Sequence, residues 1–170
     1  RRLLRLPRFD RVVAASKGTA VRRDGMTCQQ HVLTVGPWLL PATTFSTAGR
    51  VRGGTEIVIT DEGRPGAANF PGLAEGRRVI AVDLFGTGEA STTFQEPMLL
   101  ACAGQRPLGI QTAQLLAVAT WASRRYRSSS VHLRAAGRPM PVVPPLATAL
   151  EPSRFSRLTT YPGLPSLPPP

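Results

Sequence analysis

The chain has 170 residues, 42% of them hydrophobic, so it is long enough for one domain with a buried core and too apolar for wholesale disorder. No apolar run approaches the roughly 18 residues that a membrane-spanning helix needs, and the opening RRLLRLPRFD lacks the apolar stretch of a signal peptide. These features exclude a membrane-spanning helix and favour a globular domain. We assign no cellular compartment.

The net charge is +11, and because Lys17 is the only lysine, nearly all of the positive charge is arginine. A nucleic-acid or other polyanion binder is one function that fits this charge. However, the arginines are scattered along the sequence, and the densest cluster, at residues 124–127, falls where a helix should end, a place that suits cations. Aromatic residues, on which bases would stack, make up only 6%. Nucleic-acid binding is therefore the alternative interpretation.

The cysteines and histidines indicate no metal centre. Cys28 and Cys102 are too few for a disulfide framework, and neither has metal-ligand spacing with His31 or His132. We therefore predict no metal and no cofactor.

The first half of the chain predicts a hairpin followed by two buried strands. Residues 1–29 are basic and weakly patterned, and residues 30–46 predict an antiparallel hairpin that Pro37 and Pro41 interrupt. The apolar runs in TEIVITDEG and RRVIAVDLFGTGEAS are typical of strands buried on both faces, each ending in acid and glycine. Between them a short helix is expected to end at Gly76.

The second half alternates helices and strands. Residues 92–106 read as an irregular excursion. The segment RPLGIQTAQLLAVATWASRRYR predicts the longest helix, with Ile110, Ala113, Ala117 and Trp121 on one face. SSSVHLRAAG predicts a third buried strand. A short helix over residues 144–151 and a fourth strand near residues 157–161 follow.

This order predicts an α/β fold with a mostly parallel sheet, preceded by an antiparallel hairpin. We assign residues 1–29 to a basic N-terminal segment, 30–167 to the α/β domain and 168–170 to a proline tail.

The ordered set LPATTF, EIVITDEGRPG, GRRVIAVDLFGTGEAS, GQRPLGIQTAQLLAVATWAS and VHLRAAG resembles the front part of an α/β-hydrolase. The nearest branch is that of the bacterial acetyl xylan esterases and cephalosporin-C deacetylases. The resemblance covers about residues 30–167. It implies an incomplete α/β-hydrolase-like fold and carboxylesterase chemistry on a small ester or acetylated sugar.

The resemblance also locates the turn that should carry the catalytic serine. In these enzymes a G-x-S-x-G turn lifts the serine above the sheet. When Gly137 is laid on the first glycine, Pro139 falls at the serine position, and proline has no hydroxyl. A one-residue shift offers Arg138 or Met140, neither of them a nucleophile. We therefore assign no catalytic residue.

Other parts of the machinery are incomplete as well. The resemblance makes the backbone N–H groups of Gly63, Arg64 and Met140 candidates for an oxyanion hole. The acid and histidine of this fold come later in the chain, so His31 and His132 are predicted to be structural.

Asp83, at the end of a buried strand, is expected to stabilise a turn rather than to act in catalysis. We predict a partial or degenerate hydrolase domain, either a fragment or a pseudoenzyme, that is not a competent serine esterase. An uncovered edge of the sheet should favour self-association or packing against a missing C-terminal part.

Overall fold

The computed structural model describes residues 3–7, 12–23, 25–47, 51, 54–69, 76–129 and 131–161. Its strands form one seven-stranded mixed sheet in the order β1-β2-β3-β5-β4-β6-β7. The strands are β1 (Val12–Arg23), β2 (Met26–Val35), β3 (Trp38–Thr47), β4 (Thr55–Thr60), β5 (Arg78–Val82), β6 (Val131–Ala136) and β7 (Phe155–Tyr161). The helices are α1 (Gln95–Cys102), α2 (Pro107–Tyr126) and α3 (Val143–Leu150).

Strands β1, β2 and β3 form an antiparallel meander, and β3 joins the rest of the sheet by pairing antiparallel with β5. The predicted hairpin is confirmed, but the expected interruption at Pro41 is wrong. Pro41 lies inside β3 opposite Val32, at the point where the pairing with β5 ends. Its carbonyl still accepts a hydrogen bond from the N–H of Asp83 at 2.9 Å, so the sheet loses little by the missing N–H.

The next strands are parallel, as the buried apolar runs predict. β4 pairs with β5 on one side and with β6 on the other, and β6 pairs with β7. All six residues of β4 are buried. The fold class is therefore α/β, as predicted: antiparallel strands come first, and parallel strands with helices between them follow.

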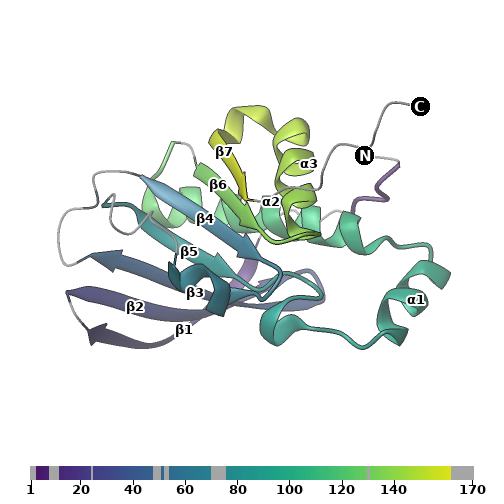
Figure 1. Cartoon of the computed structure of the whole chain (residues 1–170), viewed down its shortest axis with the longest axis horizontal. Coiled ribbons are helices and arrows are strands. Elements are labelled where there is room, and N and C mark those ends of the chain that lie inside the picture. The colour runs from purple at the N-terminus through teal and green to yellow at the C-terminus, as the bar shows by residue number, and fades with distance from the viewer. Residues whose placement is uncertain are drawn as a thin grey trace.

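Helix α2 lies against one face of the sheet (Figure 1) and carries the main core. Ile110, Ala113 and Ala117 are buried on it, and the partly buried Trp121 packs against the same core, which confirms the predicted apolar face. Pro107 opens the helix, and Arg127, with φ of 52°, ends it in a left-handed conformation.

Two elements were not predicted. β1 and the start of β2 fall in the basic segment 1–29, and α1 falls in the segment expected to be irregular. Helix α1 buries none of its residues and stands apart from the sheet in Figure 1. Its sequence has no apolar stripe at helical spacing, which is why the helix was not recognised. The predicted tail 168–170 lies outside the described residues. Within the described ranges, no helix is both long and apolar enough to cross a membrane.

Candidate functional site

Three turns meet at one edge of the sheet, where the parallel strands β4, β5 and β6 end. This edge is where open α/β sheets bind ligands. Asp61 follows β4, Asp83 follows β5 and Gly137 follows β6. The site is therefore assembled from two carboxylates and one glycine turn.

Asp83 organises the first two turns. Its buried carboxylate accepts hydrogen bonds from the backbone N–H of Arg64 at 2.6 Å and of Glu89 at 3.1 Å, and from Nε of Arg64 at 3.0 Å. A Cβ at Gly63 or Gly88 would overlap this carboxylate, so both positions need glycine. These contacts confirm the expected turn-stabilising role of Asp83.

Asp61 fills the turn after β6. One of its carboxylate oxygens accepts the backbone N–H of Arg138 at 2.6 Å, and the other accepts that of Met140 at 3.0 Å. A Cβ on Gly137 would overlap the same carboxylate, and Gly137 has φ of +115°. The backbone N–H groups of this turn therefore bind a carboxylate of the same chain, that of Asp61.

The strained position of this turn is Gly137 rather than Pro139. Pro139 has φ of −77° and ψ of −39°, an ordinary helical conformation, and it is exposed at the start of the turn that leads into α3. In a nucleophile elbow the serine itself occupies the strained position. Neither Gly137 nor Pro139 offers a hydroxyl.

The three predicted oxyanion donors all donate within the chain. The N–H of Gly63 is bonded to the carbonyl of Thr60 at 3.1 Å, that of Arg64 to Asp83, and that of Met140 to Asp61. They surround the site but do not converge on an open position in this structure. An oxyanion hole at these residues stays a prediction, and it would require Asp61 to leave Met140.

The two histidines lie away from the turn. The ring of His31 packs edge-on against Trp121 with centroids 5.4 Å apart. Burial is the main reason that the pKa of His31 lies below 6.5, with smaller contributions from the positive charges of Arg125 and Lys17. Its strand β2 is four strand spacings from β6, about 19 Å.

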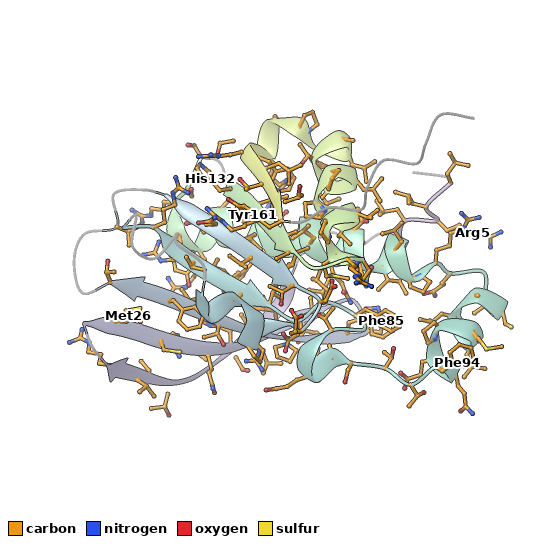
Figure 2. The ribbon with its side chains drawn as sticks, viewed as in Figure 1. Arg5, Met26, Phe85, Phe94, His132 and Tyr161 are labelled. Atoms are coloured by element: carbon orange, nitrogen blue, oxygen red, sulfur yellow. The ribbon has the colours of Figure 1, made fainter. Side chains whose placement is uncertain are left out.

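His132 lies near the start of β6, opposite Glu56 in the parallel pairing with β4. Figure 2 shows it at the other end of the sheet from Phe85, which follows β5. Neither histidine is placed to take a proton at the turn after β6, and the structural roles expected for both stay predictions.

A cavity of about 570 Å³ opens beside the turn. Apolar side chains from α2 and the turn form much of its wall, and its polar lining residues are Asp61, Thr87, Gln111 and Arg138. It is large enough for a small organic ligand. No group of three or more side chains able to hold a metal ion occurs among the residues that the structure describes.

Asp61 is the site residue that the sequence interpretation missed. Its signal was an acid that directly follows a buried strand, the same pattern that singled out Asp83. The carboxylate could not be assigned to the turn after β6 because the two segments are 77 residues apart in the sequence.

Comparison with solved structures places the fold. Acetyl xylan esterase 1 from Thermoanaerobacterium sp. matches with a TM-score of 0.70 at 13% identity, over 88% of this chain and 52% of that protein. A putative acetyl xylan esterase from Bacteroides fragilis matches with a TM-score of 0.62 at 14% identity, over 76% and 43%.

A cold-adapted esterase from an Arctic intertidal metagenomic library matches with a TM-score of 0.64 at 12% identity, over 85% of this chain and 63% of that one. The chain thus spans between 43% and 63% of the length of these three esterases. No protein-family model and no curated protein matches the sequence. At these identities the likeness establishes the fold, which agrees with the resemblance seen in the sequence.

Proposed function

We propose that this chain is a degenerate α/β-hydrolase domain, related to carbohydrate and acetyl esterases, that binds a small ester or acetylated sugar and does not hydrolyse it through a serine. The observation that carries the proposal is the turn after β6. There the carboxylate of Asp61 holds the N–H groups of Arg138 and Met140, and no serine stands at Gly137 or Pro139.

The chemistry of acyl transfer explains why this arrangement argues against catalysis. A serine hydroxyl must attack the carbonyl carbon, and preorganised N–H groups must stabilise the negative charge that develops on the oxygen. A carboxylate that already accepts those N–H groups competes with the oxygen and repels its charge. The site therefore lacks a serine nucleophile, and the charge of Asp61 would destabilise the negatively charged intermediate of acyl transfer.

Binding makes fewer demands on the same cavity. An acetyl or similar acyl group can lie against Leu108, Met140 and Val142, while Thr87 and Gln111 offer polar contacts to hydroxyl groups. This lining, together with the similarity of the fold to acetyl xylan esterases, supports an acylated sugar as the ligand class.

The test compares turnover with binding. Hydrolysis of 4-nitrophenyl acetate by the folded protein should not exceed that by a Gly137→Val variant, whose elbow cannot form. In ligand-detected NMR, acetylated xylose should show contact with the protein, and unmodified xylose should show much less. Saturable hydrolysis that depends on a serine would refute the proposal, as would equal signals from the two sugars.

Polyanion binding gains no support beyond the net charge. Several arginines are engaged inside the fold: Arg64 pairs with Asp83, Arg134 with Glu56 and Arg154 with Glu151. We therefore expect early elution from immobilised heparin as salt rises. Retention that falls steeply with salt would instead favour the polyanion interpretation.

A further inference from the structure

A second cavity, of about 450 Å³, lies between the start of β3, the loop after β5 and helix α1. It shares no lining residue with the cavity beside the turn after β6. Its wall is largely apolar, with Trp38, Leu40, Phe85, Leu99 and Leu100 as the main side chains. A cavity of this size and character is typical of a small-molecule site.

One wall of this cavity is rigid. The ring of Phe85 packs edge-on against Trp38 with centroids 5.0 Å apart. The backbone of Phe85 is held at both polar groups by α2: its N–H donates to Oε1 of Gln114 at 2.8 Å, and its carbonyl accepts from Nε2 of Gln111 at 2.8 Å. These contacts hold Phe85, which is labelled in Figure 2, in place without a ligand.

Gln114 brings an unused donor to the same wall. The residue lines the cavity and is fully buried. Because its Oε1 accepts the N–H of Phe85, the orientation of the amide is set, and Nε2 is the free end. In the described part of the chain Nε2 has no hydrogen-bond partner. Buried polar groups without partners are rare and costly, so this one calls for an acceptor.

The opposite wall is loosely held and apolar. Helix α1 buries none of its own residues, and the side chain of Leu99, which lines the cavity, is 67% exposed. Phe94, which directly precedes α1 and is not part of the cavity lining, lies well out from the sheet in Figure 2. A ligand in the cavity would cover part of the exposed side chain of Leu99. The charged lining residue is Glu96, which disfavours an anion.

We propose that this cavity binds a small, neutral, mainly apolar molecule with one hydrogen-bond acceptor, such as a ketone or an ester. The acceptor would bond to Nε2 of Gln114 once the side chains that now cover this atom shift, and the alkyl chain would lie between Phe85 and Leu99. This site is separate from the turn after β6, so the proposal does not depend on whether Asp61 blocks catalysis.

Fluorescence tests the proposal directly. The chain has two tryptophans, so a Trp121→Phe protein keeps Trp38, in the cavity wall, as the sole reporter. Titration with 2-octanone should change Trp38 emission saturably. Octane lacks the acceptor and octanoate carries a charge, so both should bind at least about tenfold more weakly.

Two matched variants separate the donor from the scaffold. Gln114→Met and Gln111→Met each remove one hydrogen bond to the backbone of Phe85, but only Gln114→Met removes the free donor. Because both variants loosen Phe85 to a similar degree, the first should weaken 2-octanone about tenfold more than the second. Leu99→Asp changes an exposed residue, so it should leave the melting temperature unchanged while weakening binding.

Each alternative outcome overturns the proposal. Absence of a saturable change with 2-octanone, equal binding of octane and 2-octanone, or unchanged binding by a folded Leu99→Asp protein would each do so. Asp61→Ala should not alter the titration with 2-octanone. Failure of this proposal is therefore distinguishable from failure of the function proposed for the turn after β6.

Discussion

Replacement of Asp61 by alanine removes the acceptor that holds the turn after β6. Asp61 accepts two backbone N–H groups, from Arg138 and Met140, at 2.6 and 3.0 Å. Without it, the N–H of the buried Met140 loses its partner, whereas that of the exposed Arg138 can turn to water. The variant should therefore be less stable, mainly through Met140.

The magnitude follows from these exposures. An unsatisfied buried N–H costs about 1–3 kcal/mol, and the loss at the exposed N–H is smaller. We expect Asp61→Ala to lower the free energy of unfolding by about 2 kcal/mol. For a chain of this length that corresponds to a fall in melting temperature of about 4–8 °C.

The assay is thermal unfolding with and without formate. Formate is a free carboxylate, and in Asp61→Ala it should fill the cradle of N–H groups and restore part of the lost melting temperature. Hydrogen exchange should show faster exchange at the amides of Arg138 and Met140 in the variant, and slower exchange after formate is added.

The matched control is Glu62→Ala, which removes the adjacent, exposed carboxylate. It should change the melting temperature little and should not respond to formate. The reasoning is refuted if Asp61→Ala and Glu62→Ala behave alike, or if exchange at the amides of Arg138 and Met140 is unchanged by loss of Asp61.

Further predictions concern the glycine turn, a buried ion pair and a buried histidine. Gly137→Ala should destabilise the protein by at least about 1–2 kcal/mol, measured by denaturant unfolding, because its Cβ meets Asp61 at a positive φ; wild-type stability would contradict this. Arg134→Met should cost about 3–5 kcal/mol by leaving the buried Glu56 carboxylate without its main partner, and a second change, Glu56→Gln, should recover part of the loss. If the double variant is no more stable than the single one, the ion pair is not the cause. Burial lowers the pKa of His31, so the unfolded state takes up its proton first, and stability should fall as the pH drops below about 6.5. His31→Gln should flatten that fall in a series of unfolding measurements, and an unchanged pH profile would count against it.

The fold was predictable where burial leaves a strong local pattern. The apolar runs of β4, β5 and β6 identify buried parallel strands, and the spacing of Ile110, Ala113 and Ala117 identifies α2. β1 and α1 were missed because both are largely exposed, so their sequences carry little apolar periodicity. The predicted break at Pro41 was wrong because a strand tolerates proline where its pairing with a neighbour ends, here the pairing of β3 with β5.

The candidate site was only partly predictable for a different reason. The absence of serine at Pro139 could be read directly, and the turn after β6 was located by its glycine. The carboxylate inside that turn comes from a strand that is adjacent in space and distant in sequence, so local patterns could not assign Asp61 to it. Which N–H groups are already bonded is likewise a property of the assembled sheet.

The most direct test of the central claim is the intact mass of the folded protein after incubation with a fluorophosphonate that labels activated serines, with a known serine esterase treated in parallel. The turn after β6 holds the carboxylate of Asp61 and no serine, so we predict an unchanged mass. A single stoichiometric adduct on a serine would contradict the account, and the labelled residue would identify the true active site.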